Sequence, residues 1–199
     1  MSSDAPRPQS WARLRARRLR REFYAQSGTE LATGLLGTIF VRRVGGEIRR
    51  ARIVETEAYL GPKDLASHSS KGRTARTEVM FGPPGCAYVY FIYGMHDMFN
   101  VVAGFAGEAH AVLVRAAEPL DGWDVDLTGP GRFARAFGVT RIDNGLDLTR
   151  GDMFFVADPF HQPRVVKSKR VGVDYSGHWK KRLLRFIDAA NPIATRLRW

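Results

Sequence analysis

Cysteine and histidine, which build most transition-metal sites, are scarce in this sequence. It has one cysteine, Cys86, and its five histidines are scattered along 199 residues. A single cysteine excludes an internal disulfide, and there is neither a Cys-x-x-Cys pair nor a His-Glu-x-x-His stretch. We therefore expect no metal and no cofactor. The histidines taken singly are typical of surface or hydrogen-bonded buried positions, and the chain fits a reducing compartment.

Long apolar runs are also missing. The least charged stretch, residues 81–96, is interrupted by Gly82-Pro83-Pro84-Gly85 and by Gly94, so no membrane span is expected. The arginine pairs near the N-terminus precede Glu22, Phe23 and Tyr24 rather than a continuous apolar segment, which argues against a signal peptide. These absences predict a soluble protein without a membrane partner.

Acidic residues are the third shortage. The sequence has 20 Asp and Glu against 31 Lys and Arg, which gives a formal net charge of +11. Such a field attracts polyanions, so nucleic acid or an anionic membrane surface is the expected class of partner. With 44% hydrophobic residues, the chain has enough apolar material for one core. We expect a disordered tail over residues 1–10 and a single domain over residues 11–199.

Short apolar runs bounded by turn residues predict a fold dominated by strands with a few helices. Because the connections are short, the strands should pair in the antiparallel sense. The expected helices are residues 11–23, which are arginine-rich, and residues 31–36 and 132–137. The expected strands are residues 38–43, 47–60, 86–93, 98–103, 109–116, 153–157, 165–173 and 182–187.

Two carboxylates and a tyrosine share a surface of the longest expected strand. The two-residue period of a strand places Glu55, Glu57 and Tyr59 on one face, with Thr56 and Ala58 on the other. A carboxylate beside a phenol can serve acid-base chemistry. An ordinary salt bridge explains Glu57 equally simply, and the pattern alone favours it.

The connection over residues 61–77 is rich in glycine, serine and lysine and carries His68, Arg73 and Arg76, which is typical of a functional loop. Further along lie a tyrosine cluster and Arg115, which together offer an aromatic pocket or, more simply, core packing. The turn Gly129-Pro130-Gly131 opens a short helix whose free amides suit a phosphate, although most such turns are only turns. The arginines of residues 11–23 suit phosphate contact and a solvated face equally well.

Several blocks of the sequence, taken in order, resemble the alkyladenine (3-methylpurine) DNA glycosylase family. Order and spacing match from about Leu31 to Phe186, and several independent blocks are far more specific than one short motif. The blocks are residues 52–62, Ser67-His68-Ser69, Met80 to Gly85, Tyr88 to Met95, Asn100-Val101-Val102, Ala111 to Ala116, Glu118-Pro119-Leu120, Gly129-Pro130-Gly131 and Arg170 to Val173.

The resemblance implies a single mixed α+β domain around a curved antiparallel sheet, and a base-excision-repair enzyme. Such an enzyme flips alkylated or deaminated purines from duplex DNA and hydrolyses the N-glycosidic bond, leaving an abasic site without strand cleavage. By the same resemblance, Glu57 activates the attacking water, Arg115 keeps Glu57 ionised, and the backbone carbonyl of Val171 completes the water site.

The resemblance also assigns the remaining residues. Electron-poor purines would stack on aromatic rings, and the gap left in the duplex would be filled by a wedge at a hairpin tip. The expected base pocket is Tyr59, His68, Tyr90 and Asn100, with Asn100 crowding the exocyclic amine of guanine, and the expected wedge is Tyr93 supported by Met95. Phosphate contacts are expected from Arg73, Arg76, Gly131, Arg132, Lys169 and Arg170.

The expected partner is thus double-stranded DNA containing damaged purines, and the family precedent is a monomer. If the organism is a bacterium, the expected location is the cytoplasm, in association with the nucleoid; if it is a eukaryote, the expected location is the nucleus.

Two alternative functions remain: a DNA-binding protein that has lost catalysis, and a basic nucleoid protein. Intact Glu57 and Arg115 argue against the first. Asp97 departs from the resemblance, because relatives more often have an aromatic residue there, and Glu78 adds a second negative charge beside the basic loop. No general acid is assigned.

Overall fold

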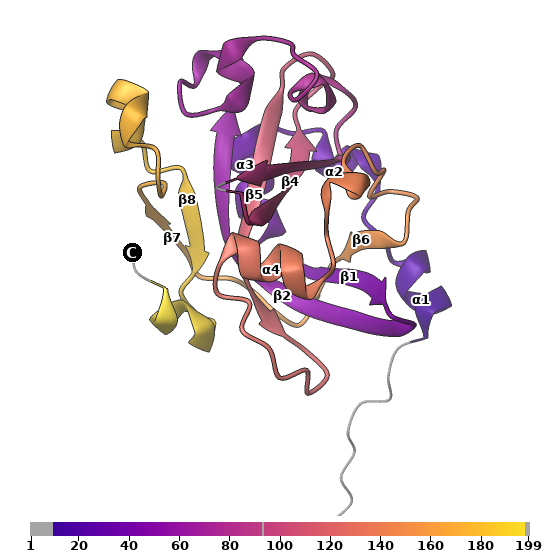
Figure 1. The fold of residues 1–199 in the computed structure, drawn as a ribbon. Helices are drawn as coiled ribbons and strands as arrows, with labels where there is room; N and C mark the ends of the chain where they lie inside the picture. Colours follow the sequence, from indigo (N-terminus) through magenta and orange to yellow (C-terminus); the bar gives the residue numbers. More distant parts are fainter. Residues whose placement is uncertain (1–9, 93, 198–199) are drawn as a thin grey trace, which may run out of the picture.

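The described part of the protein, residues 10–92 and 94–197 of a computed structural model, is built on one eight-stranded sheet (Figure 1). All strand pairs within these residues are antiparallel, which confirms the expected α+β class with an antiparallel core. The sheet order is β3-β4-β5-β2-β1-β6, and β8 pairs with both β2 and β7. The strands are β1 (Ile39–Val44), β2 (Glu47–Leu60), β3 (Ala87–Ile92), β4 (His96–Ala103), β5 (His110–Pro119), β6 (Met153–Val156), β7 (Val165–Ser168) and β8 (Arg185–Asp188).

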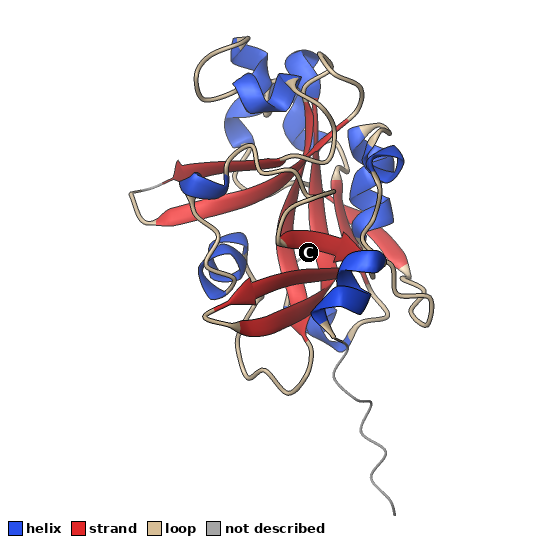
Figure 2. Ribbon diagram, turned by 90° about the vertical axis from the view of Figure 1, so that its right-hand side faces the viewer, coloured by secondary structure: helices blue, strands red, loops and turns tan. Residues whose placement is uncertain are grey.

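The helices are short and lie around this sheet (Figure 2). The α-helices are α1 (Trp11–Ala16), α2 (Arg21–Tyr24), α3 (Gly28–Leu35) and α4 (Pro130–Ala136). The 3-10 helices are η1 (Gly61–Lys63), η2 (His68–Lys71), η3 (Glu78–Phe81), η4 (Arg141–Asp143), η5 (Asp174–Lys181) and η6 (Pro192–Arg196). No helix within the described residues is long and apolar enough to cross a membrane.

Strand β2 organises the sheet because three other strands pair with it. Its first half forms a hairpin with β1 through Gly45 and Gly46, whose positive φ angles of 57° and 88° suit the tight turn that the sequence predicts. Its second half pairs with β5 on one edge and with β8 on the other. The residues that follow Ile53 are therefore held from both sides.

An irregularity in the β2–β5 ladder reverses which residues of β2 face the core. The register passes from Ile53 opposite Ala117 to Glu55 opposite Ala116 and then to Thr56 opposite Val114, so Val54 and Arg115 are each an extra residue. The core side chains of β2 are consequently odd-numbered before this point and even-numbered after it. A strand without this bulge would have turned the face of Glu55 into the core.

An aromatic cluster packs α4 against the core face of the sheet. The ring of Phe40 on β1 lies 4.7–5.2 Å, between centroids, from four other buried phenylalanine rings. These rings are Phe99 on β4, Phe155 on β6, Phe133 on α4 and Phe137, which follows the last residue of α4. Helix α3 covers a neighbouring part of the same face with Leu31 and Leu35.

Three expected elements have bounds that differ from the prediction. The helix expected over residues 11–23 is broken into α1 and α2, since Arg18 bridges Val156 and the Leu19 amide donates to the Phe155 carbonyl at 2.8 Å. The strand expected over residues 165–173 stops at Ser168. The last expected strand begins at Arg185 rather than at residue 182.

Replacing Phe40 by alanine is expected to destabilise the protein by about 3–5 kcal/mol, because it removes the ring at the centre of the aromatic cluster and leaves a cavity. The free energy of unfolding, measured by urea denaturation, checks this. Phe160→Ala is the matched control, because Phe160 is 96% exposed and its loss should change stability by no more than about 0.5 kcal/mol. A Phe40→Ala loss as small as the control's would contradict the description of the core.

Candidate active site

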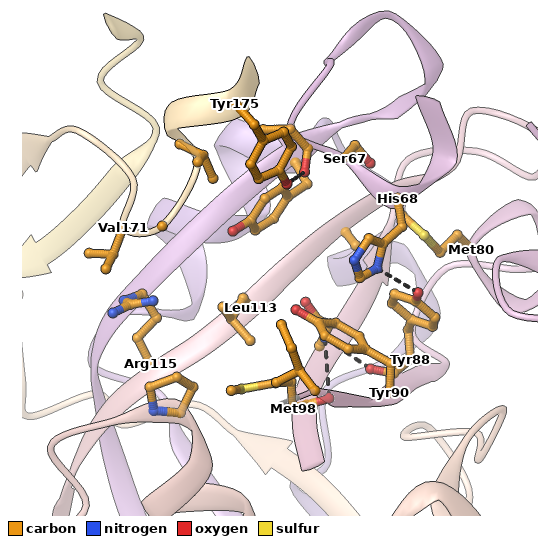
Figure 3. Close-up of a pocket in the computed structure, with 18 residues that line it drawn as sticks. Ser67, His68, Met80, Tyr88, Tyr90, Met98, Leu113, Arg115, Val171 and Tyr175 are labelled. Atoms are coloured by element: carbon orange, nitrogen blue, oxygen red, sulfur yellow. Dashed lines mark hydrogen bonds between the residues drawn. The ribbon is translucent and has the colours of Figure 1, made fainter. Parts of the chain in front are cut away.

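A cavity of about 280 Å³ opens on the face of the sheet opposite the phenylalanine cluster. Its size is near the lower end of small-molecule sites, roughly 300–1,000 Å³, and suits one planar ring system. Its walls come from β2, β3, β4, β5, η2, η3, the start of α4, and the chain that follows β7 into η5 (Figure 3). The lining residues are Tyr59, Ala66, Ser67, His68, Met80, Tyr88, Tyr90, Ile92, Met98, Asn100, Ala111, Leu113, Arg115, Pro130, Val171, Gly172, Val173 and Tyr175.

Glu57 lies directly behind this wall. Its carboxylate is fully buried and contacts three residues that line the cavity. The Val171 amide donates to Oε1 at 2.8 Å, the Tyr59 hydroxyl donates to Oε2 at 2.9 Å, and Nε of Arg115 lies 3.4 Å from Oε1. The sequence-based expectation for Val171 concerns its carbonyl and a bound water, and it stays a prediction; the amide contact with Glu57 is an addition from the structure.

Burial raises the pKa of Glu57 above its ordinary value of 4.5. The charge of Arg115, the Val171 amide and the Tyr59 hydroxyl oppose the shift, while the nearby carboxylate of Glu55 adds to it. The expectation that Arg115 favours the ionised form thus has the right sign, but desolvation is the larger effect. A carboxylate whose pKa is raised in this way suits a general base.

Arg115 reaches Glu57 from the bulge in β5. Its Nε lies closer to Glu55, at 2.8 Å, than to Glu57. Regular alternation places Leu113 and Arg115 on the cavity wall and Val112 and Val114 in the core. The bulge at Arg115 then shifts the alternation, so that the next core residue of β5 is Ala117.

Arg170 is not available to DNA phosphates, which corrects the sequence prediction. Its guanidinium is fully buried and forms two hydrogen bonds with Asp64, at 2.5 and 2.9 Å, and a third with the Ala58 carbonyl at 2.9 Å. It also lies 4.8 Å from the ring centroid of Tyr59. Arg170 therefore fixes the Tyr59 ring and the chain that carries the Val171 amide, and this inward turn ends β7.

Opposite Tyr59, the other side of the cavity is formed by His68 and two tyrosines. The His68 ring meets the Tyr90 ring edge-on with centroids 4.5 Å apart, and its Nδ1 is 2.9 Å from the Tyr88 hydroxyl (Figure 3). Burial and the nearby charge of Arg76 lower the pKa of His68 to about 4. The ring is thus neutral near pH 7 and presents an uncharged aromatic wall.

Asn100 lies at the floor of the cavity and is held by the backbone. Its Nδ2 donates to the carbonyls of Tyr88 and Met98 at 3.1 and 3.3 Å, and the side chain is buried. These two bonds fix the orientation of the amide plane. The structure therefore brings all four expected pocket residues, Tyr59, His68, Tyr90 and Asn100, to one cavity.

The tip of the β3–β4 hairpin leaves the sheet. Strand β4 pairs with β5 only from Asn100 onward, so the part of the hairpin nearer the tip projects away, as Figure 2 shows. Met95 at the tip is 68% exposed. Tyr93, the expected wedge, lies outside the described residues.

The other expected phosphate contacts differ in what surrounds them. Arg76 is exposed and stacks 5.1 Å from the Tyr90 ring centroid, and Lys169 is exposed as well. Arg132 pairs with Asp126 at 3.3 Å. Gly131 packs against His96, because an added Cβ would lie 2.9 Å from the imidazole Cγ, so packing already accounts for this glycine.

Asp97, the departure from the family pattern, and Glu78 each lie beside an arginine. Asp97 is 3.8 Å from Nε of Arg141, and Arg73 donates to Glu78 at 3.3 Å. Arg141 and Arg73 also stack on phenylalanine rings. An arginine therefore accompanies each of the two carboxylates, and neither is an isolated negative charge.

Sequence reasoning missed several lining residues, above all Tyr175, which is 72% exposed at the cavity rim and donates to the Ala66 carbonyl at 3.3 Å. Tyr175 lies two positions after the Arg170-Val171-Gly172-Val173 block, and its closeness to that block could have indicated that it lines the cavity. Met80, Met98 and Leu113 were missed because single apolar residues are typical of any core. Among the described residues, no group of three or more His, Cys, Asp or Glu is arranged to hold a metal ion.

An NMR titration of His68 is expected to give a pKa of about 4, because burial and Arg76 disfavour the charged ring. The Cε1 proton shift of His68 should stay constant from pH 8 to pH 5, the range in which free histidine, with a pKa of about 6.5, titrates. His68→Gln assigns the resonance. A His68 midpoint at the free-histidine value would contradict the closed aromatic wall.

Comparisons with known proteins agree with this geometry. The family model described as "Methylpurine-DNA glycosylase (MPG)" matches residues 22–192. A protein of Anaeromyxobacter sp. (strain Fw109-5) is 49% identical over 180 residues, covering 90% of this chain and 93% of its own. One from Myxococcus xanthus (strain DK1622) is 49% identical, covering 79% and 82%, and one from Legionella pneumophila (strain Lens) is 44% identical, covering 88% and 97%. All three carry the name "Putative 3-methyladenine DNA glycosylase". The chain belongs to the methylpurine-DNA glycosylase family.

Proposed function

We propose that this enzyme removes alkylated or deaminated purines from duplex DNA by hydrolysing the N-glycosidic bond. The class of substrates is 3-methyladenine, 7-methylguanine, hypoxanthine and ethenoadenine. Family membership and the names of the relatives support a glycosylase. The observation that carries the proposal is an aromatic cavity of base size with the buried carboxylate of Glu57 held behind its wall.

The cavity chemistry suits an electron-poor base. Tyr59 forms one wall and His68 with Tyr90 the other, so a purine between them stacks on π-systems whose faces are electron-rich. Many alkylated purines carry a positive charge, and the neutral His68 ring does not repel it. Asn100, fixed by two backbone carbonyls, is placed to exclude the exocyclic amine of normal guanine.

Hydrolysis proceeds by attack of a water on the anomeric carbon as the glycosidic bond breaks. The electrons of that bond leave with the base, the sugar passes through an oxocarbenium-like state, and the water proton moves to the Glu57 carboxylate. A cationic alkylated base leaves as a neutral molecule and needs no acid. The negative charge of Glu57 also stabilises the developing sugar cation.

Water must reach Glu57 through the shell formed by Tyr59, Arg115 and Val171. Val171 is 49% exposed, and Gly172 has a φ of +72° with no atom within 4 Å of an added Cβ. We propose that Val171 and Gly172 shift on DNA while Arg170 keeps its contacts with Asp64 and Ala58. Such a shift moves the Val171 amide off Oε1 and leaves a position for water beside Arg115, which the Val171 carbonyl completes. Because neither lysine nor cysteine is found among the described residues that line the cavity, the proposed product is an abasic site with the strand intact.

On DNA, the projecting β3–β4 hairpin is proposed to enter the duplex, with Tyr93 as the wedge and Met95 beside it. Arg73, Arg76, Arg132 and Lys169 are proposed to contact the phosphates, and one copy of the chain suffices. A wedge next to the cavity fills the gap that the flipped nucleotide leaves.

Glu57→Gln is expected to lower the rate of base release by about 10²–10⁴-fold, because an amide cannot accept the water proton. The measurement is single-turnover release of free base from methylated duplex DNA. For the wild type, the rate should fall as pH decreases through a midpoint above 4.5, where Glu57 becomes protonated.

Glu22→Gln, on the exposed surface outside the cavity, is the matched control and should keep the wild-type rate. Thermal melts should show that the Glu57→Gln protein is folded. Equal release by wild type and Glu57→Gln would exclude the mechanism. Absence of release by wild type, with damaged duplex still bound, would favour a binding protein instead. Cleavage of the DNA strand by the enzyme before any alkali is added would exclude an abasic site in an intact strand as the product.

Binding to undamaged duplex is expected to weaken linearly on a plot of log affinity against log salt concentration, because each phosphate contact releases counterions. Arg76→Gln should reduce the magnitude of the slope by about 0.9. Arg150→Gln is the control: Arg150 is also exposed, but lies beside Asp147 away from the cavity. Equal slopes for Arg76→Gln and wild type would remove Arg76 from the proposed interface.

A further inference from the structure

Four buried or nearly buried charges form one cluster behind the cavity. Glu55 and Glu57 extend from β2, Arg115 from β5 and Arg185 from β8. Oε1 of Glu55 accepts from Nε of Arg185 at 2.5 Å and from Nε of Arg115 at 2.8 Å, while Nε of Arg115 is 3.4 Å from Glu57. Two carboxylates therefore share one nitrogen of Arg115.

The short strand β8 brings Arg185 to this place. It pairs with β2 only at residues 55–57, and the register sets Arg185 directly opposite Glu57. The side chain nevertheless reaches the diagonal neighbour Glu55. The charge of Arg185 thus compensates the carboxylate that competes with Glu57 for Arg115.

We propose that Glu55 and Arg185 are positioning residues that set how strongly Arg115 favours the ionised form of Glu57. The proposal rests on the proposed function, since it concerns the same general base. Glu55 holds Arg115 at its Nε, so that the guanidinium stays on the cavity wall instead of turning fully onto Glu57. Arg185 limits the negative charge of Glu55 that Glu57 experiences.

Other titratable and charged groups also face Glu57, and hydrogen bonds or ion pairs hold them in place. Tyr59 on β2 and the Val171 amide after β7 donate to its two oxygens. Tyr90 on β3 lies further away, and the charge of Arg170 behind the Tyr59 ring is paired with Asp64. Changes at Glu55 or Arg185 therefore act on Glu57 chiefly through charge and through the position of Arg115.

The two single substitutions are expected to move the pH dependence of base release in opposite directions. Glu55→Gln removes the competing charge, so the acidic midpoint should fall by about 1 pH unit. Arg185→Met removes the positive charge that compensates Glu55, so the midpoint should rise. The double variant, which removes one charge of each sign, should lie between the two. The substrate is methylated duplex DNA, whose cationic bases do not need protonation before they leave.

Glu118→Gln is the matched control, because Glu118 on β5 pairs with Arg52 on β2 outside the cavity and should leave the midpoint unchanged. Unchanged midpoints, or shifts in one direction for both single variants, would overturn the proposal. Release by Glu57→Gln at the wild-type rate would instead overturn the proposed function on which this proposal rests. If Arg185→Met does not fold, Glu55→Gln alone decides: a midpoint at or above the wild-type value refutes the proposal. Loss of release only through general destabilisation would lower the rate without moving the midpoint.

Discussion

Burying the carboxylate of Glu57 costs free energy that the surrounding chain must offset, and much of the fold serves this purpose. Removal from water raises the pKa of Glu57, and donors from separate parts of the chain act against that shift. Arg115 comes from β5, Tyr59 from β2 itself and the Val171 amide from the segment after β7. The buried carboxylate and the aromatic wall beside it thus depend on one local balance between desolvation and charge.

Local patterns in the sequence predicted much of this site. Two-residue alternation placed Glu55, Glu57 and Tyr59 on one face, and the short connections indicated an antiparallel sheet. The family resemblance named the pocket residues that the structure brings to one cavity. Alternation did not reveal which face of β2 would be outside the core, because the reversal depends on extra residues at Val54 and Arg115 that only the pairing of the two strands defines.

Long-range pairing also explains the error at Arg170. An arginine in a basic stretch is usually exposed, and its sequence neighbours give no sign of Asp64, which lies 106 positions away and pairs with it. The same contact turns the chain inward, ends β7 and delivers the Val171 amide to Glu57. Similarly, nothing near residue 185 in the sequence indicates that Glu55 would be its partner.

Strand β3 limits how the β3–β4 hairpin can vary. Tyr88, Tyr90 and Ile92 line the cavity, whereas Val89 packs in the core and Phe91 faces Arg141 on the far side. Inserting or deleting one residue within the strand would exchange these faces and replace the aromatic wall. Strand β3 can therefore lengthen or shorten only in steps of two residues if the cavity is to keep its rings, whereas a change of length beyond Ile92 leaves this alternation intact.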